Sequence, residues 1–278
     1  MPRFDFRQVD VFTTEALRGN PLAVVLAADP LDEGRMKELA RWTNLSETTF
    51  LLTPTDAGAD YRVRIFTPQG ELPFAGHPTL GSCHVWLAAG GRPRGDVAIQ
   101  QCGVGLVRVK RDGDRLAFAA PPLRRSGLVD DALVARIAAG LRIAPGAIRA
   151  AQWIDNGPGW VAVMLGSRTE LLALRPDYPA LEGVALGVVA PCDGPDAPAG
   201  VAFEVRAFFP RVGEDPVTGS LNAGLAQWLI GAGIAPSRYI ASQGTAMGRA
   251  GRIHVERIGD DIWIGGHTVG CIEGTLTL

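Results

Sequence analysis

The sequence lacks any block of like charge and any long apolar run. Lys and Arg number 27 against 29 for Asp and Glu, so the net charge over 278 residues is −2. A nucleic-acid or membrane-surface partner would select a basic stripe, so we expect neither partner. The N-terminal segment alternates polar and apolar residues instead of joining a charged leader to an apolar run. This pattern predicts no signal peptide and no membrane span.

Cysteine is scarce and widely spread. Cys83, Cys102, Cys192 and Cys271 form no C-x-x-C motif and no Cys/His pair at metal-ligand spacing. We therefore expect reduced thiols in a cytoplasmic protein and no metal site. The glycines follow neither the G-x-G-x-x-G nor the G-x-x-x-x-G-K-[ST] order of nucleotide-binding loops, and G-x-S-x-G, the motif of a serine nucleophile, is absent.

A 28-residue block at 64–91 recurs without a gap at 206–233. Gln101 matches Gln243 at the same offset. A period of half the chain predicts two similar lobes that face each other across a cleft, where a ligand site is the usual expectation. The 47% apolar content is sufficient for two cores. The residues that recur are Arg64, Phe66, Pro68, Trp86, Leu87 and Gly91, which become Arg206, Phe208, Pro210, Trp228, Leu229 and Gly233.

Short apolar segments that alternate with polar residues dominate the chain. They are rich in Val, Ile and Phe and are separated by Gly, Pro and Asp, which is typical of strands in antiparallel or mixed sheets. Two amphipathic segments, 33–42 with Asp32 as N-cap and 130–141, predict helices on the outside of a lobe. The predicted strands lie at 8–12, 61–66, 104–109, 161–165, 201–208, 252–257 and 262–264.

Two further helices, predicted at 79–89 and 220–230, carry almost no charge around their circumference. A helix that is apolar or small on every side has to be buried on every side. We therefore expect an α+β fold of two pseudosymmetric lobes, each a curled, barrel-like, mostly antiparallel sheet around a central buried helix. The predicted lobes are 1–123 and 124–278, and the segment from about 266 to 278 is a candidate to pack on the first lobe.

Each central helix is entered through a tight turn, Gly76-His77-Pro78 in the first lobe and 215–220 (Asp-Pro-Val-Thr-Gly-Ser) in the second. A helix N-terminus exposes unpaired N–H groups and the positive end of its dipole, so two such turns at one cleft would bind a carboxylate or stabilise an enolate. His77 and Asp215 each adjoin a proline, which would hold them in a rigid backbone. Ordinary capping turns are the structural alternative.

Three acids compete for the role of a proton-transferring group. Glu47 lies in a segment flanked by Leu45 and Phe50, where partial burial would raise its pKa toward neutrality. Glu71 and Glu214 are of the same type, and spacing does not rank the three. His267 lies in a Gly-rich segment near the C-terminus that could approach the cleft.

The chain resembles the PhzF family of phenazine-biosynthesis-like proteins, which share their fold with diaminopimelate epimerase. The resemblance covers nearly the whole length and implies the two-lobed fold with a central helix in each lobe. The matching motifs, in order, are 9–13 (VDVFT), 19–24 (GNPLAV), 44–48 (NLSET), 66–68 (FTP), 73–79 (PFAGHPT), 214–216 (EDP), 218–220 (TGS), 243–244 (QG) and 265–266 (GG).

The resemblance also implies site residues. The essential acid of the family is the Glu of N-L-S-E-T, which selects Glu47, and the His of G-H-P and the Asp of E-D-P correspond to His77 and Asp215. Substrate contacts are implied for Gly76, for Asn20 of the G-N-P motif, and for Gly219 and Ser220.

The activity implied by the resemblance is a cofactor-independent isomerisation of trans-2,3-dihydro-3-hydroxyanthranilate, in which a proton moves between ring carbons. We expect an isomerase acting on this or a similar small carboxylated metabolite, and the family suggests a homodimer. Glu47 would serve as the one base that removes and returns the proton. The related epimerases use a cysteine at each helix entrance, whereas Cys83 lies inside the first helix, so a two-thiol racemase is disfavoured. Epimerisation by Glu47 and Asp215, or a non-catalytic metabolite- or protein-binding role on the same scaffold, are the alternatives.

Overall fold

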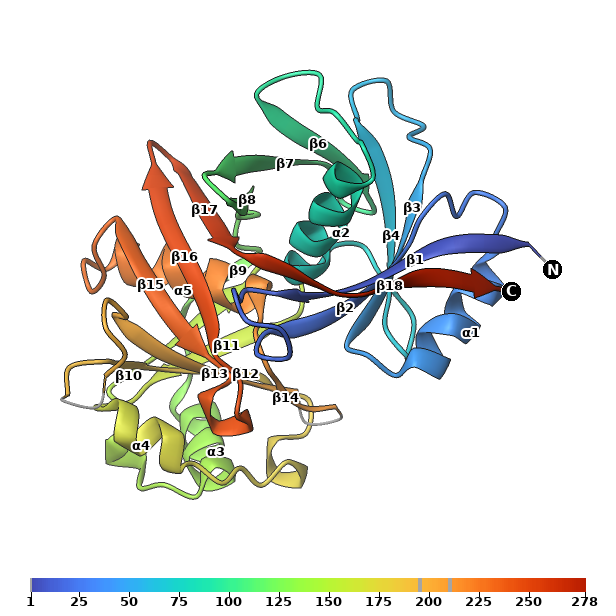
Figure 1. Ribbon diagram of the computed structural model, residues 1–278. Helices are drawn as coiled ribbons and strands as arrows, with labels where there is room; N and C mark the ends of the chain where they lie inside the picture. The colour runs from blue at the N-terminus through green and yellow to red at the C-terminus, as the bar shows by residue number, and fades with distance from the viewer. Residues whose placement is uncertain (1, 195–196, 210–211) are drawn as a thin grey trace. The chain divides into compact units, whose positions relative to one another are not determined.

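The computed structural model describes residues 2–194, 197–209 and 212–278 (Figure 1). The chain divides into two compact units. Unit 1 comprises the residues up to Ala119 together with Gly265–Leu278, and unit 2 comprises Ala120–Ile264. The division falls a few residues before the predicted boundary at 123–124, and the C-terminal segment belongs to unit 1.

Unit 1 is a sheet of mostly antiparallel strands with one outer and one central helix. Its last strand comes from the C-terminus of the chain and pairs with the first, so that Arg3 lies opposite Thr277 and the two ends of the chain are neighbours (Figure 1). The elements of unit 1 are β1 (Arg3–Val11), β2 (Asn20–Val25), α1 (Glu33–Thr43), β3 (Glu47–Leu52), β4 (Tyr61–Phe66), β5 (Glu71–Leu72), α2 (Gly76–Ala88), β6 (Val97–Cys102), β7 (Gly105–Asp112), β8 (Arg115–Ala119) and β18 (Thr268–Thr277).

Unit 2 repeats this plan with an additional outer helix. Strand β17 (Asp261–Gly266) runs across the division between the units. The other elements are β9 (Arg125–Leu128), α3 (Asp131–Leu141), η1 (Pro145–Ala147), β10 (Ala150–Asp155), β11 (Trp160–Met164), α4 (Arg168–Ala173), η2 (Pro179–Leu181), β12 (Ala185–Pro191), β13 (Phe203–Phe209), β14 (Gly213–Asp215), α5 (Gly219–Gly231), β15 (Arg238–Gln243), η3 (Thr245–Met247) and β16 (Gly251–Ile258).

The strand pairings of the two units match one for one. In unit 1 the order β18-β1-β2-β3-β4-β6-β7 has parallel pairs at β2–β3 and β4–β6 and antiparallel pairs elsewhere. In unit 2 the order β9-β10-β11-β12-β13-β15-β16 has its parallel pairs at β11–β12 and β13–β15, in the same places. The predicted α+β fold with two pseudosymmetric, mostly antiparallel halves is confirmed.

The central helices are buried, as their uncharged sequences predict. Helix α2 contacts strands on every side, from β1 to β4, from β6 to β8, and β18. Residues Gly76–Cys83 are all buried. Most of the first ten residues of α5 are buried as well, and this helix packs on β10, β11 and β16. Because each helix contacts the strands of its own unit, the sheet fixes the place where the helix begins.

The outer helices begin at conventional N-cap residues. Asp32 accepts a hydrogen bond from the Arg35 amide at the start of α1, and Asp130 accepts one from Leu133 at the start of α3. Apolar faces of these helices complete two outer cores. Helix α4, which the sequence analysis did not predict, is capped by Ser167.

The repeat has a one-residue insertion that the gapless sequence match misses. Glu71 lies opposite Phe66 in the β4–β5 hairpin, and Glu214 lies opposite Phe208 in the β13–β14 hairpin. The arginine two residues before each phenylalanine is seven residues from its glutamate in the first case and eight in the second. Leu72 of unit 1 therefore corresponds to Asp215 of unit 2. Pro210, the predicted counterpart of Pro68, lies outside the described residues.

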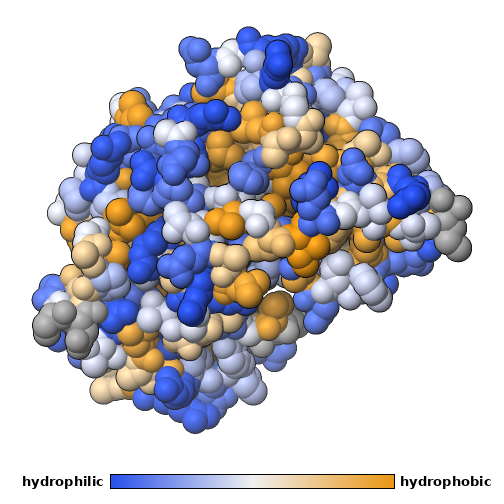
Figure 2. Space-filling model, viewed as in Figure 1, coloured by the Kyte–Doolittle hydropathy of each residue, from blue (hydrophilic) through white to orange (hydrophobic). Residues whose placement is uncertain are grey.

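Hydrophilic and hydrophobic residues are interspersed over the face shown in Figure 2. Exposed large apolar side chains come from separate elements, as Trp42 on α1, Leu128 on β9 and Ile272 on β18 illustrate. Within the described ranges, no helix has the length and apolar character that crossing a membrane requires.

Candidate active site

Glu47 and His77 approach each other inside unit 1. Glu47 is the first residue of β3, and His77 is the second residue of α2. His77 Nε2 lies 3.4 Å from Glu47 Oε2, and the two side chains are only 5% and 14% exposed. This distance exceeds that of an ordinary hydrogen bond. The structure thus brings together the predicted acid and the predicted histidine.

The contact between these two residues is not a salt bridge. Burial disfavours the charged imidazolium and lowers the pKa of His77 to about 3, although a hydrogen bond to the Pro21 carbonyl opposes the shift. The ring is therefore neutral at physiological pH. A neutral imidazole has one N–H and one lone pair, so Nε2 can donate to a Glu47 carboxylate in one tautomer and accept from a Glu47 carboxylic acid in the other. The neutral His77 can therefore form a hydrogen bond with Glu47 both when Glu47 is a carboxylate and when it is a carboxylic acid.

Asn20 holds the other side of the histidine ring. Its Nδ2 lies 3.4 Å from His77 Nδ1, and the residue is fully buried at the start of β2. The preceding Gly19 donates its N–H to Asp10 Oδ2 at 2.9 Å. A Cβ at Gly19 would lie 2.1 Å from the Val11 carbonyl oxygen, so only glycine fits. In the G-N-P motif, glycine is therefore required by the close approach of Gly19 to the Val11 carbonyl, and Asn20 contacts the ring of His77.

The entrance of α2 leaves its first amides without a side-chain cap. The N-cap residue is Ala75, and no described side chain accepts a hydrogen bond from the first amides of α2, whereas α1, α3 and α4 each have a capping side chain. Gly76 and His77 are the first two residues of the helix, and Pro78 has no N–H to satisfy. Two amide donors at the positive end of the helix dipole are thus available to an anion beside Glu47.

The structure separates Glu47 from the two competing acids. Glu71 accepts two hydrogen bonds from Arg64, at 2.7 and 2.6 Å. Glu214 accepts two from Arg206, at 2.8 and 2.7 Å. Both carboxylates are therefore neutralised by a guanidinium fork. Glu47 is the one of the three that faces a neutral histidine.

Asp215 stands at the entrance of the central helix of unit 2. Its carboxylate accepts a short hydrogen bond from the Thr218 hydroxyl. Thr218 is the N-cap residue of α5, and no described side chain caps the helix. Since the Thr218 hydroxyl is turned toward Asp215, the first amides of α5, from Gly219 and Ser220, remain available as at α2.

A buried glutamine organises this second entrance. Gln243 Oε1 accepts from the Thr218 amide at 3.0 Å and from Asn222 Nδ2 at 2.9 Å. Its Nε2 donates to the Asp215 carbonyl oxygen at 3.1 Å and to Thr218 Oγ1 at 3.0 Å. All four hydrogen-bonding positions of the amide are used, so the backbone around Asp215 and Thr218 is held from behind.

The counterpart of Gln243 in unit 1 differs from the one that the repeat predicts. Gln101, the sequence match, bonds Thr55 at the surface. Gln100 is the fully buried residue, and its Nε2 donates to Thr79 Oγ1 in the first turn of α2 at 3.0 Å. The glutamine that contacts the central helix of unit 1 is thus Gln100 and not Gln101, since neighbouring residues of a strand face opposite sides of the sheet.

Ser220 is positioned by two residues that the sequence analysis missed. Trp160 Nε1 donates to Ser220 Oγ at 3.0 Å, and Asn156 Nδ2 donates to the Ser220 carbonyl at 2.8 Å. Because the hydroxyl oxygen accepts from Trp160, its proton can be donated elsewhere. Neither residue belongs to a sequence motif, and only the fold brings them beside α5.

The remaining candidates are placed as follows. His267 Nε2 lies 3.2 Å from Asp114 Oδ1 in an exposed contact. The residues before and at the helix entrances contain no cysteine, and Cys83 is buried within α2. Over the described ranges, no group of three His, Cys, Asp or Glu side chains could hold a metal ion.

Known proteins resemble this chain over most of its length. The family described as "Phenazine biosynthesis-like protein" matches residues 9–274. "Antisense-enhancing sequence 1" of Schizosaccharomyces pombe is 34% identical, with 99% of each chain covered. "Trans-2,3-dihydro-3-hydroxyanthranilate isomerase" of Pseudomonas aeruginosa is 37% identical over 230 residues, which cover 78% of this chain and 77% of the relative.

Solved structures show the same fold. The crystal structure of a phenazine biosynthesis protein of the PhzF family from Enterococcus faecalis aligns over the whole of both chains, with a TM-score of 0.81 and 26% identity. A hydroxyproline epimerase from Agrobacterium vitis aligns over 99% of this chain and 92% of its own, with a TM-score of 0.58 and 15% identity, which shows a shared fold.

These findings define an enzyme of the isomerase and epimerase class on an epimerase-like fold. The chain belongs to the PhzF family of phenazine biosynthesis-like proteins.

Proposed function

We propose that the protein is a cofactor-independent isomerase that moves a proton between two carbons of a small carboxylated substrate. The observation that carries the proposal is the contact between Glu47 and the neutral His77, which lie 3.4 Å apart with both side chains largely shielded from water. A carboxylate beside a neutral imidazole can gain and lose a proton without creating a second charge.

The Glu47 carboxylate would take a proton from a carbon next to a conjugated system. The electron pair left on that carbon delocalises into the substrate, and Glu47, now a carboxylic acid, returns the proton to another carbon of the system. One C–H bond breaks and one forms, and the double bonds shift, so the step needs no oxidant or reductant. The neutral His77, whose Nδ1 faces the Asn20 amide, would donate from Nε2 to the Glu47 carboxylate and hold it in place.

In unit 1, Gly76 at the uncapped entrance of α2 is the proposed amide donor to a substrate carboxylate. In unit 2, Gly219 and Ser220 at the uncapped entrance of α5 are the proposed substrate-binding residues. Asp215 is proposed as the second ionisable group, which holds an amine or hydroxyl of the substrate, and Asn20 as the residue that orients His77. A homodimer stays a prediction, which analytical ultracentrifugation would test.

The first substrate to test is trans-2,3-dihydro-3-hydroxyanthranilate, because a relative 37% identical to this chain bears the name of its isomerase. Incubation in deuterated water, followed by proton NMR, reports double-bond migration and deuterium uptake at carbon separately. Migration supports the proposal. Loss of optical activity without migration would indicate an epimerase, and tight binding with neither change would indicate a metabolite-binding protein.

A further inference from the structure

The β13–β14 hairpin of unit 2 presents two adjacent acids to opposite faces of the sheet. Glu214 lies opposite Phe208, and Asp215 lies opposite Ala207. Side chains alternate along a strand, so Glu214 shares the outer face with Phe208 and with Arg206, two residues earlier, whereas Asp215 is turned to the other face. A slip or twist of this three-residue strand would misdirect Asp215.

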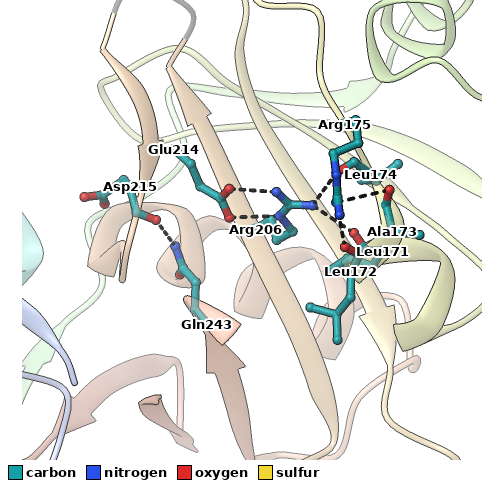
Figure 3. Close-up of polar contacts among 9 residues, drawn as sticks. All are labelled: Leu171, Leu172, Ala173, Leu174, Arg175, Arg206, Glu214, Asp215 and Gln243. Carbon is teal, nitrogen blue, oxygen red and sulfur yellow. Dashed lines mark hydrogen bonds and ion pairs between the residues drawn. The ribbon is translucent and has the colours of Figure 1, made fainter. Parts of the chain in front are cut away.

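Arg206 fixes the outer face of the hairpin from two directions. Its Nε and Nη2 donate to Glu214, and its Nη1 donates to the carbonyl oxygens of Leu171 and Leu174 at 3.1 and 3.0 Å (Figure 3). These carbonyls belong to the end of α4, where the negative end of the helix dipole favours a cation. The Arg206 and Glu214 side chains are only 6% and 11% exposed, so water competes little for these hydrogen bonds.

Asp215 is held from the opposite direction. Gln243 Nε2 donates to its backbone carbonyl oxygen, as Figure 3 shows, while its carboxylate is bonded by Thr218. The chain of contacts therefore runs from α4 through Arg206 to Glu214, then along one peptide bond to Asp215 and the α5 entrance.

Unit 1 offers an internal comparison. Arg64 binds Glu71 in the equivalent hairpin, but these side chains are 20% and 37% exposed, and Arg64 also binds Glu33 of α1. The residue after Glu71 is Leu72, which carries no charge. The arginine–glutamate pair is thus buried, and its arginine pairs with a single acid, in unit 2, where the residue after the glutamate is the ionisable Asp215.

We propose that the Arg206–Glu214 pair is a positioning device that sets the orientation of Asp215, in addition to any part it has in folding. The inference rests on the proposed role of Asp215 in the reaction. Neither Arg206 nor Glu214 is assigned a contact with the substrate.

The decisive variant replaces both members of the pair, Arg206→Met with Glu214→Leu. Apolar residues of similar size often replace a buried ion pair without loss of stability, so this variant keeps the fold while removing the directional fork. We expect its melting temperature to stay close to that of the wild type. Misplacement of a reacting group by about 1 Å can cost about 100-fold, so kcat with trans-2,3-dihydro-3-hydroxyanthranilate should fall by about 10- to 100-fold, with KM changed by less than about threefold.

Glu204→Gln is the matched control. Glu204 is fully buried on the same strand and the same face, two residues before Arg206, and pairs with Arg168 at 3.0 Å instead of with the hairpin. Its loss should lower the melting temperature and leave kcat within about threefold. An equal fall of kcat in the double variant and in Glu204→Gln would overturn the positioning role.

Two further measurements separate this inference from the proposed function. Amide hydrogen exchange of β14 should quicken in the double variant and stay unchanged in Glu204→Gln, whatever the substrate is, and unchanged β14 protection in the double variant would overturn the inference. If Asp215→Asn keeps full activity while β14 protection falls as predicted, the pair positions Asp215 and the proposed role of Asp215 is wrong.

Discussion

Exchange of Gly224 for alanine tests how closely the second central helix must approach its sheet. Gly224 lies in the middle of α5, and a Cβ added there would be 2.4 Å from the carbonyl oxygen of Ile154 on β10. Ordinary contact begins near 3.4 Å, so the added methyl group is 1.0 Å too close. The obstacle is backbone, which cannot turn aside as a flexible side chain would.

The expected cost follows from two opposing effects. Overpacking typically costs about 1–3 kcal/mol, and contact with backbone favours the upper end. Alanine is better than glycine in a helix by about 1 kcal/mol, which offsets part of the cost. Gly224→Ala should therefore lower the free energy of unfolding by about 2 kcal/mol, which corresponds to about 4–8 °C in melting temperature for a domain of this size.

Gly231→Ala is the control in the same helix. At Gly231, in the last turn, no described atom beyond the neighbouring residues and the backbone of α5 itself lies within 4 Å of the place that the added methyl group would occupy. This variant should gain about 0.5 kcal/mol, because it restricts only the unfolded chain. Differential scanning calorimetry of the two variants should give shifts of opposite sign. Two stabilising shifts would refute the close approach of α5 to β10.

Further predictions concern the first unit. His77 has a folded pKa of about 3, below its unfolded value of 6.5. The unfolded state therefore gains a proton first as pH falls, and His77 removes up to about 1.4 kcal/mol of stability per pH unit below 6.5. Urea unfolding at pH 7 and pH 5 should thus show a smaller loss for His77→Gln than for the wild type, and equal losses would argue against a buried neutral ring. Gly19→Ala should lower turnover at least tenfold, because its Cβ would collide with the Val11 carbonyl, whereas Gly70→Ala, in open space, should match the wild-type rate. Cys83 is fully buried with its pKa raised to about 12, so iodoacetamide at pH 8 should leave it unmodified in the native protein, and rapid labelling would contradict its burial in α2.

The fold could largely be predicted from the sequence because uncharged helical segments and alternating strand segments can each be recognised within a short stretch of the chain. The uncharged helices 79–89 and 220–230 had to be buried, and alternating segments had to be strands. Both central helices begin up to three residues earlier than predicted, since Pro78 is compatible with a first helical turn. Helix α4 was missed because it has only six residues and too little periodicity to detect.

The candidate site could be predicted only in part. Glu47 and His77 belong to motifs, but spacing alone did not separate Glu47 from Glu71 and Glu214, because the ion pairs that neutralise those two acids join residues across hairpins. Trp160 and Asn156 had no signal at all, since each reaches Ser220 from a distant part of the chain. The one-residue insertion in the second hairpin also hid the match between Leu72 and Asp215.

The correspondence of Leu72 with Asp215 shows that the two units carry different ionisable groups. The duplicated fold supplies an uncapped helix entrance in each unit, but the acids beside them have different origins. Glu47 begins a strand before the repeated block, and Asp215 lies within the block at a position where unit 1 has Leu72. The symmetry of the scaffold therefore does not extend to the ionisable groups.

The turnover of Glu47→Gln tests the central claim most directly. The variant keeps the size of the side chain and its contact with His77 but cannot accept a proton from carbon. General acid–base catalysis is worth about 100- to 10,000-fold, so kcat with trans-2,3-dihydro-3-hydroxyanthranilate should fall by at least about 100-fold while the melting temperature is preserved. A Glu47→Gln protein that isomerises this substrate at near the wild-type rate would contradict the assignment of Glu47 as the proton-transferring base.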